Sequence, residues 1–347
     1  MTSVERLLPE WAPQEAIILA WPDQHTDWAP WLVEARQTYL ALMQAITANG
    51  VGVILLIRSE AKPDFVAMAD NLSGVLLVEA DYNDTWVRDY GFLTLASGER
   101  RVPLSYVFNG WGNKFDARKD NDINLNVLAS MCVEPMRFVD MVCEGGALEI
   151  DQQGHLLSTA LCLQNPERNG DQSLSAYQAA FAQQLGATRV SIFQHGHLEG
   201  DDTDGHIDTL VRFTPSQGLV IQSAFNVPQD PHHDGLRDLV EECRQHCPEH
   251  TIFELPLPCI VNAAGERLPA SYANYLISNG QILFPVYGAP QDQQALEIVQ
   301  RAHPGFQVVA IDALPLVQQF GSIHCISMQV PKGTLKGEVL AQLTTEV

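Results

Sequence analysis

Short apolar runs alternate with amphipathic helical stretches along the whole chain, and this alternation restricts the possible folds most strongly. The runs Val51–Ile57 and Gln281–Phe284 predict buried strands. The segment Trp28–Ala48 repeats apolar residues at three- and four-residue spacing, which predicts a helix with one buried face. Alternating strands and helices indicate an α/β protein. No glycine-rich phosphate loop follows the first predicted strand, Ala16–Trp21, which argues against a nucleotide-binding doubly wound sheet.

The chain shows no long linker that would separate two domains. The best candidate, Pro228–Pro231, is short and is typical of a loop. We therefore expect one domain spanning residues 1–347. Its predicted strands group into about five units of roughly sixty residues, which favours a radially repeated architecture.

Composition and charge exclude several classes of partner. Apolar residues make up 46% and charged residues 18%, which is typical of a globular protein. The net charge of −22 disfavours nucleic acids and anionic membranes and raises the local concentration of cations. No apolar stretch is long enough to cross a bilayer, and the N-terminal run Met1–Arg6 lacks the pattern of a signal peptide. We expect a cytoplasmic protein with reduced thiols that binds neither nucleic acid nor membrane.

Seven cysteines are present, and their odd number and irregular spacing argue against a disulfide framework. Cys243 and Cys247 lie four residues apart, close to His246 and His250, so a zinc site is conceivable. Structural zinc sites usually combine paired units from two segments, and no second unit is evident. Packing of these thiols on a helix is the favoured interpretation.

Two distant segments carry the residues of a candidate nucleophilic site. Cys325 opens the predicted strand Ile326–Val330. His206 and Asp208 are separated by one residue, so in a strand they would face the same side, and the carboxylate could orient the imidazole. A cysteine with histidine and acidic residues elsewhere in an intracellular chain is a candidate nucleophile, because the fold brings them together. The alternative for Cys325 is inert packing, since cysteine is among the most buried residue types.

Three acidic clusters bear on the chemistry. Asn83–Gly91 holds two acids, one base and two aromatic residues, although a solvated loop remains the alternative. Glu144 precedes two glycines, which permit close approach of a ligand or merely form a tight turn. Asp201–Asp208 invites a calcium interpretation but lacks the bidentate glutamate spacing of a calcium loop. Carboxylates around a thiol repel anions, so we expect a cationic substrate.

Taken together, these segments resemble the agmatine deiminase and bacterial peptidylarginine deiminase family of the guanidino-group-modifying (pentein) superfamily. The matching segments, in family order, are Trp11–Glu15, Ala20–Pro22, Trp86–Gly91, Phe108–Gly112, Glu144–Gly146, Asn165–Asn169, Gly205–Asp208, Ser271–Tyr275 and His324–Cys325. The resemblance implies an α/β fold in the form of a five-bladed propeller with pseudo-fivefold symmetry. It also implies catalysis without a metal or an organic cofactor.

The resemblance further implies a role for each candidate residue. Cys325 would attack the guanidinium carbon, Asp89 and Asp208 would hold its nitrogens, and His206 would move protons. Glu144 would support the substrate or His206. The substrate-binding residues that we predict are Asp84, Trp86, Trp111, Asp202 and Asn274.

The function predicted first is hydrolysis of agmatine, a small cationic guanidine, to N-carbamoylputrescine and ammonia, as in putrescine and polyamine biosynthesis. The alternative within enzymes is a deiminase that converts free or peptidyl arginine to citrulline, for which Arg88 could anchor the carboxylate. An alternative of another class is a non-catalytic or metal-binding protein on the same scaffold. A homo-oligomer is compatible with each of these.

Overall fold

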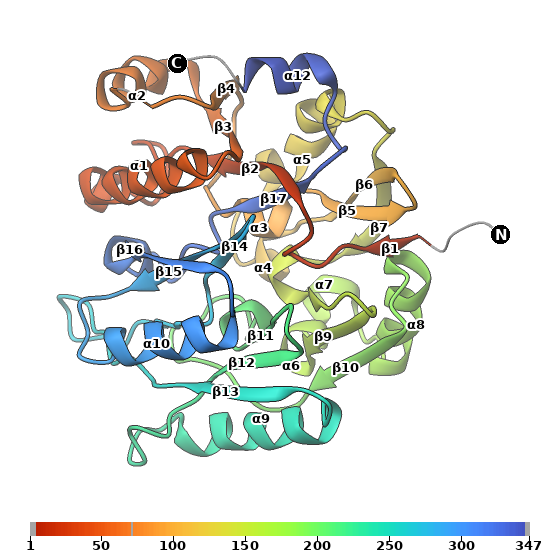
Figure 1. Cartoon of the computed structure of the whole chain (residues 1–347), viewed down its shortest axis with the longest axis vertical. Coiled ribbons are helices and arrows are strands. Elements are labelled where there is room, and N and C mark those ends of the chain that lie inside the picture. The colour runs from red at the N-terminus through yellow and green to blue at the C-terminus, as the bar shows by residue number, and fades with distance from the viewer. Residues whose placement is uncertain (1–4, 71, 344–347) are drawn as a thin grey trace. The chain divides into compact units, whose positions relative to one another are not determined.

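The computed structural model describes residues 5–70 and 72–343, so Met1–Val4 of the N-terminal run considered above lie outside the described residues. The chain divides into two compact units. Unit 1 comprises Met1–Gly145, Ile277–Asn279 and Cys325–Val347, and unit 2 comprises Gly146–Leu276 and Gly280–His324. Within the described residues, the strands form five separate sheets (Figure 1).

The first sheet of unit 1 is built by crossover connections. Its strands, in spatial order, are β17 (Met328–Pro331), β2 (Gln14–Ala20), β3 (Gly52–Ile57) and β4 (Val75–Glu79). The last three strands run parallel and are joined through α1 (Leu32–Ala48) and α2 (Lys62–Met68), whereas β17 pairs antiparallel with β2. Helix α1 packs on β3 and buries the apolar face that its spacing predicts (Figure 1).

The second sheet of unit 1 has the order β1 (Arg6–Leu7), β5 (Leu93–Ser97), β6 (Arg100–Val107) and β7 (Arg137–Val142). Helix α3 (Val87–Tyr90) precedes β5 in the chain. Helices α4 (Gly110–Asn113) and α5 (Arg118–Asn126) lie between β6 and β7 in the sequence. A further helix, α12 (Gly337–Gln342), follows β17. Strands β5 and β6 form a hairpin through Gly98, whose positive φ of 63° suits glycine.

Unit 2 repeats the combination of short mixed sheets and covering helices. Its strands are β8 (Glu149–Ile150), β9 (His155–Thr159), β10 (Arg189–Phe193), β11 (Val211–Phe213), β12 (Gly218–Gln222), β13 (Thr251–Leu255), β15 (Gln281–Val286) and β16 (Gln307–Asp312). Its helices are α6 (Ala160–Leu163), α7 (Pro166–Asn169), α8 (Leu174–Leu185), α9 (His233–His246), α10 (Asp292–Ala302) and α11 (Leu314–Val317). Helix α9 packs against β10, and α10 packs against β13 (Figure 1). The remaining strand, β14 (Leu276–Ser278), contains the point at which the chain passes from unit 2 to unit 1.

The mixed sheets with helices confirm the predicted α/β class. Two local predictions were wrong. The segment around His206 and Asp208 is not a strand but a 3-10 helix, Ile207–Thr209, because threonine hydroxyls bond its main chain in place of a neighbouring strand. Cys325 does not open a strand: it lies in a turn before β17, and its carbonyl accepts a hydrogen bond from the Arg88 N–H.

One further expectation concerns membranes. In the part of the chain that the structure describes, no helix combines the length and the hydropathy that crossing a bilayer requires.

Candidate active site

In unit 1, the predicted catalytic segments converge on the main chain of Arg88. The Arg88 N–H donates to the carbonyl of Cys325 at 3.1 Å. On the other side, a Cβ added to Gly145 would lie 2.2 Å from the Arg88 carbonyl oxygen, so only glycine permits this approach. The neighbouring residues Asp89, Glu144 and Cys325 are all buried. The structure therefore brings together three of the five predicted catalytic residues by holding their backbones around the main chain of one residue, Arg88.

Asp89 is oriented by an indole. Trp111 Nε1 donates to Asp89 Oδ2 at 2.9 Å, and both side chains are buried. Trp111 adopts a left-handed conformation with φ of 57°. Its predecessor Gly110 also has positive φ, and a Cβ there would lie 2.3 Å from the carbonyl oxygen of Phe115. The glycine therefore allows the turn that points Trp111 at the carboxylate.

Asp84 and Trp86 lie on the loop that leads into α3. Trp86 packs at 45° against Trp28, with the ring centroids 5.4 Å apart, and the Trp28 Nε1 donates to Thr85 Oγ1. Burial, with a smaller contribution from the nearby Asp27, raises the pKa of Asp84 to about 7, against the opposing effect of a hydrogen bond from the Thr85 N–H. A group with this pKa changes charge near neutral pH.

The side chain of Arg88 is engaged within the protein. Its Nη1 donates to Gln329 Oε1 at 2.7 Å, and its Nη2 lies 4.0 Å from Glu10 Oε2. The residue is 3% exposed. These contacts argue against Arg88 as an anchor for a substrate carboxylate.

In unit 2, His206 is held at the start of the 3-10 helix Ile207–Thr209. Its N–H donates to Thr203 Oγ1 at 3.1 Å, and its carbonyl accepts from the Thr209 hydroxyl at 2.8 Å. Thr159 Oγ1 fixes the carbonyl of the preceding Gly205 at 2.7 Å. His206 is 1% exposed, so its imidazole is sheltered from bulk water.

Asp208 and Asn274 join His324 in a buried group. Asp208 Oδ2 lies 2.6 Å from His324 Nδ1, and Asp208 is completely buried. Asn274 Oδ1 accepts from the His324 N–H at 3.1 Å, and Asn274 Nδ2 donates to the Asp208 carbonyl at 3.5 Å. Burial alone would raise the pKa of Asp208, but the hydrogen bond to His324 and the neighbouring cationic groups lower it. Asp208 is therefore held as a carboxylate.

The buried side chain of Arg212 stabilises the segment that contains Asn274. Arg212 is 0% exposed, and its Nε donates to Glu149 Oε2 at 2.9 Å. Its Nη1 donates to the carbonyls of Ala273, at 3.2 Å, and Tyr275, at 2.6 Å. These two residues flank Asn274, so the ion pair fixes the segment that contacts both Asp208 and His324.

Asp202 differs from the other predicted site residues because it is exposed, on the loop before His206. Its neighbour Asp201 accepts from the N–H groups of Thr203 and Gly205, each at 2.8 Å. Asp204 Oδ2 lies 2.7 Å from Nη1 of the buried Arg168. Asp201 and Asp204 thus stabilise the conformation of the loop. This role accounts for two of the acidic residues that suggested a calcium site.

The two cysteines that suggested a zinc site, Cys243 and Cys247, are buried. Cys243 lies on α9 and Cys247 follows its end, and both are buried. Burial raises the pKa of Cys243 and raises that of Cys247 to about 12. Since zinc binds the thiolate, these values favour packing.

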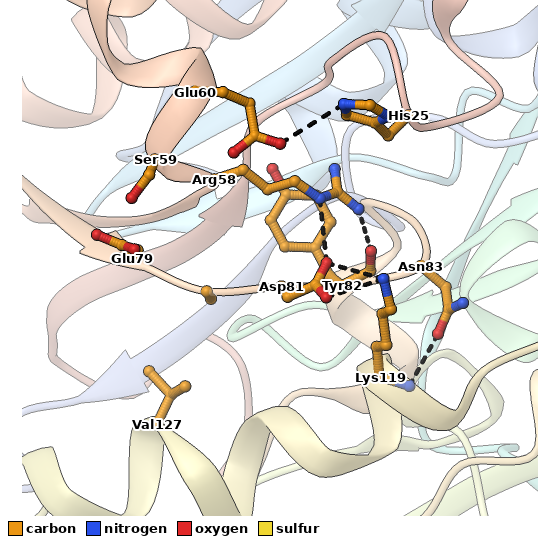
Figure 2. A pocket seen from close by; sticks show the side chains of 11 residues that line it. His25, Arg58, Ser59, Glu60, Glu79, Asp81, Tyr82, Asn83, Lys119 and Val127 are labelled. Carbon is orange, nitrogen blue, oxygen red and sulfur yellow. Dashed lines mark hydrogen bonds and ion pairs between the residues drawn. The ribbon is translucent and has the colours of Figure 1, made fainter.

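A surface pocket of about 670 Å³ lies in unit 1 beside the loop that carries Asp84. Figure 2 shows Arg58 and Lys119 directed at Asp81, which lies 3.2 Å from Arg58 Nε and 2.8 Å from Lys119 Nζ. The hydrogen bond to Lys119 lowers the pKa of Asp81, with a smaller contribution from Arg58. None of the predicted site residues lines this pocket, so it is separate from the proposed chemistry.

Sequence reasoning assigned no role to His324, Arg212 or Glu149. His324 lies next to Cys325 in a matched motif, which is a usable signal. Arg212 and Glu149 carry no local signal, because an isolated charge in an apolar strand shows its partner only in the folded chain.

Comparisons with known proteins agree on one family. The family model for Porphyromonas-type peptidyl-arginine deiminase matches residues 6–331. A Yersinia pseudotuberculosis protein named "Putative agmatine deiminase" is 31% identical, over 93% of this chain and 94% of its own. A solved Porphyromonas gingivalis protein named "Putative Arginine Deiminase" is 38% identical with a TM-score of 0.87, covering 96% of this chain and 100% of its own. A cysteine-to-serine variant of C. jejuni agmatine deiminase with substrate bound is 28% identical with a TM-score of 0.88, covering 96% and 98%.

Proposed function

Because the chain belongs to the Porphyromonas-type peptidyl-arginine deiminase family, we propose that it hydrolyses agmatine to N-carbamoylputrescine and ammonia. The general class is a hydrolase that cleaves a C–N bond of a linear amidine, the class to which its relatives' names assign them. The observation that carries the proposal is the placement of Cys325 and Asp89 beside the main chain of Arg88, with the Asp89 carboxylate held by Trp111. A thiol and a carboxylate so placed suit attack on a bound guanidinium.

The proposed reaction has two steps. Cys325 Sγ attacks the guanidinium carbon and forms a C–S bond, while His206 gives a proton to the departing nitrogen, which leaves as ammonia. His206 then takes a proton from water, whose oxygen attacks the same carbon. The C–S bond breaks and releases the Cys325 thiolate, and the remaining proton of that water passes to solvent as the C=O group forms. The product carries the new C=O group as a carbamoyl amine. The bound substrate of the cysteine-to-serine variant of the C. jejuni enzyme supports a catalytic thiol by analogy.

Two carboxylates would hold the guanidinium. Asp89 uses Oδ2 to accept from Trp111, and Asp208 uses Oδ2 to bind His324. We propose that each carboxylate binds the substrate through its Oδ1, so that Trp111 and His324 set the direction of the two acids. Glu144, which is buried and precedes the glycine that packs on the Arg88 carbonyl, would support the substrate or His206.

Charge favours agmatine, which carries two cations and no carboxylate. The engagement of Arg88 by Gln329 and Glu10 leaves that residue poorly suited to a substrate carboxylate. Asp84 and the exposed Asp202 are our candidates for the distal amine, and Trp86 for contact with the alkyl chain.

Free or peptidyl arginine is the second candidate, because the most identical of the solved relatives above is named as an arginine deiminase. Ammonia release from agmatine, arginine and a peptide ending in arginine, at equal concentration and low ionic strength, tests the choice. We expect agmatine to have the highest kcat/KM, and an equal or higher value for arginine would reject the agmatine proposal. Ammonia release from none of the three would reject the deiminase proposal as a whole.

We further propose that residues 1–347 form a single deiminase domain whose five sheets are the blades of a pseudo-fivefold propeller. The presence of five short sheets of three or four strands in the described residues supports this. We also propose a cytoplasmic location and a role in putrescine formation, since N-carbamoylputrescine becomes putrescine when its carbamoyl group is removed.

A further inference from the structure

Helix α5 (Arg118–Asn126) buries polar side chains that its own main-chain hydrogen bonds do not need. Asp120 is 3% exposed and Asn124 is 1% exposed. Burying a carboxylate or an amide is costly unless its hydrogen-bonding groups find partners. The partners of these side chains therefore indicate what the helix does.

Asp120 holds the start of the loop that carries Asp84 and Trp86. Its Oδ1 accepts from the Asn83 N–H at 2.6 Å, and the Asp84 N–H lies 3.3 Å from both carboxylate oxygens. The main chain of the helix adds a second contact, because the Lys119 N–H donates to Asn83 Oδ1 at 2.8 Å.

Asn124 holds the other end of the same segment. Its Nδ2 donates to the carbonyl of Tyr90 at 2.7 Å and to Ser105 Oγ at 2.8 Å. The Tyr90 hydroxyl donates to the Asp84 carbonyl at 3.0 Å, which ties the two ends together. Residues 83–90, which include Asp89, are thus fixed at both ends.

Asn121 connects the same helix to a second loop, which carries Trp111. Its Oδ1 accepts from the Phe108 N–H at 2.8 Å, just before the turn that presents Trp111. Since Trp111 Nε1 donates to Asp89, the two loops held by α5 meet at the proposed guanidinium carboxylate.

We propose that α5 is a positioning element for substrate binding, and that Asp120 and Asn121 are positioning residues which act through Asp84, Trp86, Asp89 and Trp111. This inference rests on the proposed function, because it assigns those four side chains to the substrate. Small displacements of groups that orient a substrate can cost about a hundredfold in rate.

The test compares Asp120→Asn with Asp122→Asn, the same chemical change on the same helix at an exposed position. Asp120→Asn can keep an acceptor oxygen for the Asn83 N–H, but it places an N–H donor at the Oδ2 position, 3.3 Å from the Asp84 N–H. We expect it to lower kcat/KM by roughly 10- to 100-fold, chiefly through KM. We expect Asp122→Asn to stay within about twofold of the wild type.

A second pair of variants covers the case in which Asp120→Asn does not fold. Asn121→Ala removes only the contact to the Phe108 N–H, and Asn126→Ala is its exposed control. We expect Asn121→Ala to raise KM, and Asn126→Ala to leave it unchanged. A folded Asp120→Asn or Asn121→Ala protein with wild-type kcat/KM would overturn the proposal, whatever its thermal stability.

Two further readouts separate this inference from the proposed function. The near-UV circular dichroism of the tryptophans should change in Asp120→Asn and not in Asp122→Asn, which requires no substrate. The dissociation constant for agmatine, measured in a Cys325→Ser background, should rise with Asp120→Asn. If the wild type releases no ammonia from any guanidine, the proposed function fails, and an unchanged near-UV spectrum in Asp120→Asn would then reject the positioning role separately.

Discussion

Replacing Arg212 with methionine should both destabilise unit 2 and impair the site. The guanidinium is 0% exposed and bonds Glu149 together with the carbonyls of Ala273 and Tyr275. Methionine has comparable length but no donors. Arg212→Met therefore leaves a buried carboxylate without its cation and two carbonyls without these donors.

The expected cost follows from that arrangement. Removing one partner of a buried ion pair typically costs about 3–5 kcal/mol, because the remaining charge is left uncompensated. Glu149 Oε1 also accepts from the Phe213 N–H, so Glu149→Gln can keep this contact while removing the charge. We expect the double variant Arg212→Met/Glu149→Gln to recover about 1–3 kcal/mol relative to the sum of the single changes.

Urea unfolding of the wild type, the two single variants and the double variant measures these energies. Arg237→Met is the control, because Arg237 is exposed and its surface ion pairs with Asp234 and Asp238 should contribute little to stability. Under conditions where the protein is folded, Arg212→Met should also lower kcat/KM, since Ala273 and Tyr275 flank Asn274. A loss of stability no greater than that of Arg237→Met, or strict additivity in the double variant, would refute the reasoning.

Three further outcomes are expected. Cys325→Ser should abolish ammonia release without lowering the thermal unfolding midpoint, because serine is close in size but a poor nucleophile; release near the wild-type rate would assign the thiol to packing. Asp89→Asn should raise KM and lower kcat in steady-state assays, at a cost of about 1.5–3 kcal/mol, and an unchanged kcat/KM would remove Asp89 from the site. Burial raises the pKa of Asp84 from 3.8 to about 7, so its neutral form stabilises the fold at low pH and this contribution is lost as the pH rises through about 7. Asp84→Asn should therefore flatten the pH dependence of the free energy of unfolding in urea between about pH 4 and 7. The difference between the two proteins should reach up to about 4 kcal/mol before the reduction by solvent screening at this partly exposed residue. Parallel pH profiles of the wild type and the variant would contradict the assignment.

Elements with a regular apolar pattern could be predicted from the sequence. The strand predicted at Val51–Ile57 begins one residue later in the structure, as β3, and the helix predicted at Trp28–Ala48 ends at Ala48 as α1 does, after a 3-10 helix over Ala29–Trp31. Strand β6 was missed, because Arg100, Arg101 and Pro103 interrupt its pattern. The start of helix α5 has no apolar pattern that would predict it, since its first turn is polar on the side that Asp120 buries.

The candidate site could be predicted in its parts but not in its connections. Cys325, Asp89 and Glu144 stand in motifs, and the structure holds their backbones around the main chain of Arg88. The contacts from Trp111 to Asp89 and from His324 to Asp208 join residues 22 and 116 positions apart. No local pattern encodes such a pair, because each depends on how separate elements pack.

The structure also changes what the acidic sequence implies about the substrate. Asp120 and Asp201 accept hydrogen bonds from main-chain N–H groups and shape loops, and Glu149 pairs with the buried Arg212, so these three acids already have partners within the protein. The proposed preference for a cationic substrate therefore rests locally on Asp89, Asp208 and Asp84, and on the net charge of −22 only through long-range steering. Added salt screens steering more strongly than it screens buried pairs. If salt lowers kcat/KM for agmatine and arginine by the same factor while their ratio persists, the local carboxylates set the specificity, whereas a ratio that falls to one would assign it to the field of the whole chain.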